Sequence, residues 1–224
     1  MSSRGRACVY IDGFNLYYGA LKGSTEKWLD LAAWSGLLLP GYAVERIVYC
    51  TARITGRPDD PDAHVRQDAY LRALATLPTV DVLEGIFKVS KPRMFRISPD
   101  SCDCCGGHQL PCSCCRGSTV QVMKTEEKGS DVNLAVQLVV DGFQDRFDTA
   151  LVVSNDSDIQ PAVDVVRTQL GKRVIVADPR SSRYPALIGD ERRRVRREPL
   201  VQAQFPSPVV GADGRAITRP NSWE

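Results

Sequence analysis

The sequence contains no run of 18 apolar residues, and its start, Met-Ser-Ser-Arg-Gly-Arg, lacks the apolar stretch of a secretory signal. We therefore expect a soluble, cytoplasmic protein with no membrane partner. The net charge is also small: +2 at pH 7 is not enough to require a polyanionic partner. The 224 residues are 43% hydrophobic, which is enough for a substantial core, and no break in composition predicts a second core of similar size.

Apolar, β-branched runs alternate with helix-like patterns along the chain. The runs cover residues 7–11, 46–52, 80–89, 149–153 and 173–177. The helix-like patterns cover residues 15–22, 29–38, 62–76, 131–140 and 158–170. Alternation of this kind predicts a mostly parallel sheet with helices on both faces, a three-layer α/β domain. Right-handed crossovers then place the carboxyl ends of the strands along one edge.

Four aspartates occupy positions that bring them to this edge. Asp12 closes the first apolar run, Asp156 and Asp158 follow the run at 149–153, and Asp131 opens a helix-like segment. Two carboxylates about 4 Å apart repel by roughly 4 kcal/mol at an effective dielectric near 20, so a converging group needs protonation or a cation. Because the candidate ligands include no histidine or thiolate, Mg²⁺ or Mn²⁺ fits better than Zn²⁺.

We expect each of the four aspartates to have a distinct role in phosphodiester hydrolysis. A metal ion at this edge would orient a water, lower the pKa of that water and neutralise charge on the phosphate. Asp12 and Asp156 each follow a strand, and we expect them to contact the metal directly. Asp131 and Asp158 are expected to bind a second ion or to hold a metal-bound water. Asn15, within one turn of Asp12, offers an amide that orients Asp12 or donates to a phosphate oxygen.

Basic and aromatic residues near these segments are candidates for contact with substrate. Lys124 and Lys128, which precede Asp131 in the chain, are expected to contact the phosphate or stabilise the transition state. Arg193 and Arg194 belong to the run 192–197, in which five of six residues are arginine, and which forms either a solvated helix or loop face or a phosphate contact. Three aromatic residues beside Asp12 either stack bases or form an ordinary buried face: Phe14, Tyr17 and Tyr18.

Six of the eight cysteines lie between residues 102 and 115, as two C-x-x-C pairs separated by six residues. In a reducing cytosol this spacing favours a metal over disulfides. The pairs predict a structural Zn²⁺, since four thiolates leave no position for water, with ligands Cys102, Cys105, Cys112 and Cys115. Cys104, Cys114 and His108 leave the ligand set open. An iron–sulfur cluster, a redox-active cluster and unliganded thiols remain as alternatives.

Antiparallel pairing of the runs that flank the cysteines, 94–97 and 120–124, would make this segment a small zinc-binding β-hairpin. The segment from 199 onwards is rich in proline and glycine, and it is expected to pack as an extended arm or to remain mobile. Trp223 indicates docking on the same subunit or on a second one, so a homodimer is possible. The predicted organisation is a main domain over 1–198, an insertion at 94–123 and an arm at 199–224.

Three segments carry a resemblance to a known family. Residues 9–17, 126–135 and 152–158 resemble the signature segments of the NYN domain family, a branch of the PIN-like nucleases, and the likeness spans most of the chain. The tail from Gln204 to Trp223 is similar to that of a bacterial subgroup. The resemblance implies a PIN-like fold and a metal-dependent ribonuclease that uses the four aspartates, with Asn15 beside them. Many relatives have glycine and an aromatic residue where this chain has Asn155 and Ile159, and the cysteine-rich insertion is not a general family feature.

The sequence therefore predicts a Mg²⁺- or Mn²⁺-dependent ribonuclease that hydrolyses single-stranded or structured RNA. A haloacid-dehalogenase phosphatase would need a second acid two residues after Asp12, where Phe14 stands. The alternative from another class is a non-catalytic RNA-binding or scaffolding protein that binds through the zinc hairpin and the arginine run. Retention of all four acids argues against it, because their mutual repulsion has no use in a protein that does not cut.

Overall fold

The computed structural model describes residues 5–56, 60–95, 119–180, 183 and 185–223. The chain divides into two compact units. The first consists of residues Met1–Ile86 and Lys128–Glu224, and the second of Phe87–Glu127. Each unit is described by itself.

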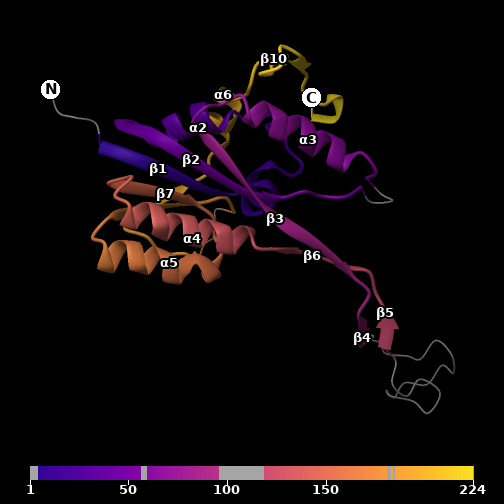
Figure 1. Cartoon of the computed structure of the whole chain (residues 1–224), viewed down its shortest axis with the longest axis horizontal. Coiled ribbons are helices and arrows are strands. Elements are labelled where there is room, and N and C mark those ends of the chain that lie inside the picture. Colours follow the sequence, from indigo (N-terminus) through magenta and orange to yellow (C-terminus); the bar gives the residue numbers. More distant parts are fainter. Residues whose placement is uncertain (1–4, 57–59, 96–118, 181–182, 184, 224) are drawn as a thin grey trace. The chain divides into compact units, whose positions relative to one another are not determined.

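A seven-stranded sheet forms the frame, in the order β6-β3-β2-β1-β7-β8-β9 (Figure 1). Its strands are β1 (Gly5–Asp12), β2 (Tyr42–Ala52), β3 (Val80–Ser90), β6 (Lys124–Lys128), β7 (Thr149–Val153), β8 (Arg173–Asp178) and β9 (Glu191–Arg194). From β3 across to β9 every neighbouring pair is parallel. The predicted parallel sheet is therefore present.

Helices cover both faces of the sheet in the first unit (Figure 1). Alternation along β1 explains the two cores, because Ala7, Val9 and Ile11 point to one and Cys8 and Tyr10 to the other. The helices on the first face are α2 (Leu31–Leu38), α3 (Ala63–Leu74) and α6 (Arg197–Gln202). Those on the second face are α4 (Ser130–Phe143) and α5 (Gln160–Asp164). The mixed α/β, layered class predicted from the sequence is confirmed.

Helix α4 is anchored to the sheet by a buried carboxylate. Asp141 is fully buried, and it accepts hydrogen bonds from the Tyr10 hydroxyl at 2.8 Å and from the Arg46 guanidinium at 2.6 Å. Gln137, one turn earlier on α4, donates to it at 2.8 Å. A buried charge is tolerated when it is paired and fully hydrogen-bonded, so these contacts fix how α4 lies on β1 and β2.

The first half of the arginine run differs from its predicted conformation. Residues Glu191–Arg194 form the edge strand β9, parallel to β8, rather than a helix or loop, whereas Arg196 lies in a loop and Arg197 begins α6. Arg192 forms an ion pair at 2.7 Å with Asp178, which is fully buried at the end of β8. An edge strand made of charged residues was missed because it has no apolar alternation.

The segment after α6 lies against the first core. Its short elements are β10 (Val209–Val210), β11 (Ala216–Ile217) and a final 3₁₀ turn (Asn221–Trp223), and β10 pairs antiparallel with β11. Phe205 is buried in this core, and the ring of Trp223 lies 6.3 Å from Trp28 and 6.1 Å from Tyr70. The tryptophan thus docks on its own chain. Among the described residues, no helix is long and apolar enough to cross a membrane.

The second unit contains a short antiparallel hairpin. Strand β4 (Arg93–Phe95) pairs with β5 (Thr119–Gln121), and Met94 lies opposite Val120. This pairing agrees with the predicted hairpin. The predicted zinc ligands Cys102, Cys105, Cys112 and Cys115 lie outside the described residues, so the zinc site stays a prediction.

Candidate metal and phosphate site

The candidate site begins where β1 ends, in the middle of the sheet. Asp12 is the last residue of β1, and its register partner on β2 is Cys50. On the other side, Ile11 pairs with Val153, the last residue of β7, so that Ser154 follows directly beside Asp12. Parallel strands thus bring two segments 142 residues apart to one edge, as the sequence predicts.

The Asp12 carboxylate is 5% exposed and accepts three hydrogen bonds. The backbone N–H of Asn15 donates at 2.9 Å, the Asn15 side-chain amide at 3.0 Å and the Ser154 hydroxyl at 3.0 Å. The first of these is a helix cap, since Asp12 precedes α1 (Gly13–Leu16). Asp12 therefore has a fixed position before any ligand binds.

Burial raises the pKa of Asp12 above its ordinary value, and the negative charge of Asp156 raises it further. Hydrogen bonds from Asn15 and Ser154 lower the same pKa and offset part of the effect. Within the described part of the chain, no lysine or arginine forms an ion pair with Asp12. A cation bound beside this carboxylate would offset the energetic cost of its buried negative charge.

Ser154 links Asp12 to the second acidic segment. Its hydroxyl is fully buried, donates to Asp12 and accepts the backbone N–H of Asp156 at 3.1 Å. Asp156 in turn accepts the N–H of Asp158 at 3.0 Å and caps the 3₁₀ turn Ser157–Ile159. The direct bond from Ser154 to Asp12 was not foreseen from the sequence, because a contact across two strands leaves no local pattern.

Among the residues that the structure describes, the side-chain amide of Asn15 is hydrogen-bonded at its nitrogen but not at its oxygen. Its amide nitrogen donates to Asp12, while its oxygen, Oδ1, is buried without a hydrogen-bond partner among the described residues. A buried acceptor without a donor is rare in native structures and calls for an explanation such as an ion or a water. An amide oxygen beside a carboxylate is a donor set that suits Mg²⁺ or Mn²⁺.

The other two aspartates are less closely associated with Asp12. Asp131, in the first turn of α4, accepts the N–H of Val132 at 2.8 Å, and Asp158 lies exposed in the 3₁₀ turn. Across the described residues, no three side chains of the types His, Cys, Asp or Glu are grouped closely enough to hold one ion. The structure thus couples Asp12 electrostatically to Asp156 and does not gather all four acids around a single point.

The predicted basic contacts differ in their availability. Lys124, Lys128 and Arg194 are exposed. The Arg193 guanidinium donates to Glu191 at 2.6 Å and to the carbonyl oxygen of Leu38, so its charge is used within the fold. Of the two arginines predicted to bind substrate, Arg194 is therefore the exposed one.

Tyr49 lies close to the same strand end. A Cβ atom added to Gly13, next to Asp12, would stand 2.8 Å from the Tyr49 hydroxyl and 2.8 Å from the carbonyl oxygen of Cys50. Burial raises the pKa of Tyr49, and the charge of Asp12 contributes to this shift. Glycine is thus required where α1 begins, because a larger residue would displace Tyr49 or the backbone at Cys50.

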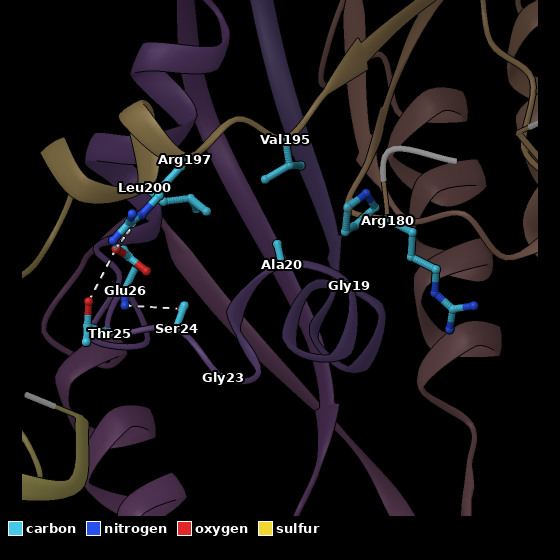
Figure 2. Close-up of a pocket in the computed structure, with 11 residues that line it drawn as sticks. Gly19, Ala20, Gly23, Ser24, Thr25, Glu26, Arg180, Val195, Arg197 and Leu200 are labelled. Atoms are coloured by element: carbon cyan, nitrogen blue, oxygen red, sulfur yellow. Dashed lines mark hydrogen bonds and ion pairs between the residues drawn. The ribbon is translucent and has the colours of Figure 1, made fainter. Parts of the chain in front are cut away.

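A pocket of about 500 Å³ lies beside the π-helical turn η1 (Tyr17–Leu21) (Figure 2). Its lining includes Gly19, Glu26 and Arg197, and Arg197 forms an ion pair with Glu26 at 2.9 Å. None of the four predicted aspartates lines it. It is therefore separate from the candidate site at Asp12.

Fold and site together define an α/β protein with carboxylates at the carboxyl edge of a parallel sheet. Residues 109–189 match the profile of the NYN domain, a nuclease-like family; the match includes Asp131, Asp156 and Asp158 and begins well after Asp12. The chain is also 29% identical to 6-hydroxy-3-succinoylpyridine 3-monooxygenase HspA of Pseudomonas putida, over 97% of this chain and 75% of that protein.

Among solved structures, the chain is similar to a protein of unknown function from Vibrio parahaemolyticus. The TM-score is 0.47 at 16% identity, over 88% of this chain and 97% of the other.

Proposed function

We propose that the protein is a Mg²⁺- or Mn²⁺-dependent ribonuclease of the NYN type. The observation that carries the proposal is the pairing of a buried carboxylate, Asp12, with a buried amide oxygen, Asn15 Oδ1, that has no donor among the described residues. Both groups lie at the strand edge where Asp156 contributes further negative charge. The NYN match over residues 109–189 supports the same class.

In this proposal Asp12, Asn15 and Asp156 hold the metal ion. When bound, the metal supplies a polarised water and positive charge at the scissile phosphate. Ser154 keeps the Asp12 carboxylate in place through its 3.0 Å hydrogen bond. Asp131 and Asp158 lie on the flanking α4 and 3₁₀ turn, and they would act through waters or a second ion.

The exposed cations would hold the RNA rather than take part in bond cleavage. Lys128 and Arg194 are exposed on β6 and β9 in the first unit, and Lys124 is exposed in the second unit. Contacts to phosphate oxygens are electrostatic and independent of base sequence. RNA affinity should therefore fall steeply with salt.

The test is cleavage of labelled single-stranded RNA with Mg²⁺ or Mn²⁺, with and without chelator. Asp12→Asn should reduce the rate at least about 100-fold, since loss of a metal ligand lowers both affinity for the ion and positioning of the phosphate. Asp213→Asn, an exposed aspartate in the segment after α6, is the matched control and should cut normally. Cleavage that survives Asp12→Asn would mean that a contaminating nuclease or another site is responsible.

The non-catalytic alternative makes the opposite prediction in the same assay. An RNA-binding or scaffolding protein would retain RNA without cutting it under either metal. In that case Asp12→Asn would leave RNA affinity unchanged, because the carboxylate would have no task in binding.

A second candidate function rests on the similarity to HspA over nearly the whole chain. By its name that relative oxidises 6-hydroxy-3-succinoylpyridine, a reaction that inserts one oxygen atom from O₂ and needs a two-electron reductant. Incubation with this pyridine, reduced nicotinamide and O₂ distinguishes the two functions by formation of a hydroxylated product. We expect no product, since the groups proposed to hold a metal here are the Asp12 carboxylate and the Asn15 amide oxygen, which suit Mg²⁺.

A further inference from the structure

We propose that Tyr18 and Lys22 form a stacking site for an unpaired nucleotide, on the turn that follows the helix capped by Asp12. This inference rests on the proposed function and specifies its substrate as single-stranded RNA. Tyr18 is 53% exposed, although tyrosine is a large aromatic residue that normally buries most of its ring. The Nζ atom of Lys22 lies over one face of that ring, 4.8 Å from its centre.

The exposed ring is held in one orientation. Tyr17 packs against Tyr18 with ring centres 5.3 Å apart and planes at 83°, an edge-to-face contact. Both tyrosines belong to the turn η1 (Tyr17–Leu21), which continues α1, and Asp12 caps α1. The helix buries Leu16 and Leu21 in the first core, so this scaffold is fixed to the sheet.

The spacing suits a nucleotide chain that passes the site. Tyr18 lies six positions after Asp12, which corresponds to no more than about 9 Å along the helix axis. This arrangement matches the two parts of a nucleotide, because a base stacks on the ring face opposite Lys22 and the ammonium meets the phosphate. A base in a duplex has both faces covered, so the site selects unpaired RNA.

The experiment measures binding separately from cleavage. Fluorescence anisotropy of a labelled oligouridine measures its binding to the protein. Chelator is present so that the RNA is not cut during the measurement. Tyr18→Ala should weaken binding about tenfold, whereas Tyr18→Phe should change it less than twofold, because stacking needs the ring and not the hydroxyl. Phe143→Ala is the matched control, since Phe143 is 65% exposed at the far end of α4 and should have no effect.

An oligonucleotide with abasic sugars completes the test. Wild type and Tyr18→Ala should bind the abasic strand equally, because the phosphates remain and the bases are gone. Equal affinity of wild type and Tyr18→Ala for oligouridine overturns the stacking site. If the RNA is cut normally in that case, the ribonuclease proposal still stands. If tenfold weaker binding accompanies no cleavage by wild type under either metal, the stacking site holds and the ribonuclease proposal falls.

Discussion

At the scale of the residue, Asp12 is notable because its environment favours the protonated form. Burial and Asp156 raise its pKa, so the folded protein binds a proton there more tightly than the unfolded chain does. The bound proton contributes to the free energy of unfolding at pH values below the ordinary pKa near 3.8. That contribution is lost as the pH rises through the raised pKa of Asp12 in the folded protein. Once the pH exceeds that raised value, the ionised Asp12 opposes folding in the absence of a metal.

Asp12→Asn should therefore leave the metal-free protein as stable as wild type at pH 7, or up to about 2 kcal/mol more stable. An amide keeps the shape, and a flip of Asn15 would let its unpartnered oxygen accept a hydrogen bond from the new side chain. Urea denaturation in chelator at pH 5 and pH 7 measures the difference, which should grow with pH. A variant that loses stability at pH 7 would show that the carboxylate is structural.

Addition of Mg²⁺ or Mn²⁺ should reverse the order of the two proteins. A ligand that binds the folded state at 100 times its dissociation constant stabilises by about 2.7 kcal/mol. Wild type should gain this stabilisation and Asp12→Asn should not, as measured by thermal denaturation. Ser154→Ala is expected to show an intermediate gain, because the carboxylate remains but loses the 3.0 Å hydrogen bond that positions it.

At the scale of the element, the attachment of α4 depends on the buried charge of Asp141. Arg46→Met removes the 2.6 Å ion pair and leaves that carboxylate with only the more distant Arg146, at 3.6 Å, which should destabilise the fold by about 3–5 kcal/mol. Asp81→Asn removes the other partner of Arg46, a carboxylate 53% exposed, and should cost less than about 1 kcal/mol. Chemical denaturation of both variants tests the contrast, and equal effects would contradict a dominant role for the buried pair.

The elements that sequence reasoning identified are those with strong local patterns. The run 173–177 was predicted from its β-branched residues, and β8 (Arg173–Asp178) includes it. Asp12 was placed at a strand end by the same logic. Strand β9 was missed because Glu191–Arg194 has no apolar residue, and its pairing with β8 comes from tertiary structure. The Ser154–Asp12 bond likewise depends on strand order, which no single segment encodes.

At the scale of the whole molecule, the segment after α6 is linked to the candidate site through aromatic rings. Trp223 packs on Tyr70 at 6.1 Å, Tyr70 packs on Tyr49 at 6.3 Å, and Tyr49 adjoins Gly13 beside Asp12. Trp223→Ala should destabilise the protein by about 2 kcal/mol and weaken Mg²⁺ binding several-fold, because Tyr49 loses its support. Titration calorimetry and denaturation measure these effects.

Val210→Ala is the control for that substitution. Val210 lies in the same segment, is 66% exposed and belongs to β10. Its replacement should change neither stability nor Mg²⁺ affinity beyond experimental error. If Trp223→Ala lowers stability but leaves Mg²⁺ affinity intact, the aromatic contacts hold the segment without reaching the site.

The cysteine-rich segment lies in the sequence of the second unit, whose described strands β4 and β5 offer few apolar residues for a core. A short unit of this kind gains stability from a metal, and we predict one Zn²⁺ per chain bound by four thiolates. Elemental analysis should find one equivalent of zinc in wild type and less than about 0.2 in a variant with Cys102→Ser and Cys115→Ser. Iron in place of zinc would identify a cluster, and absence of both metals would leave the thiols unliganded. Because Asp12 and Asn15 belong to the first unit, the variant should keep its Mg²⁺-dependent stabilisation.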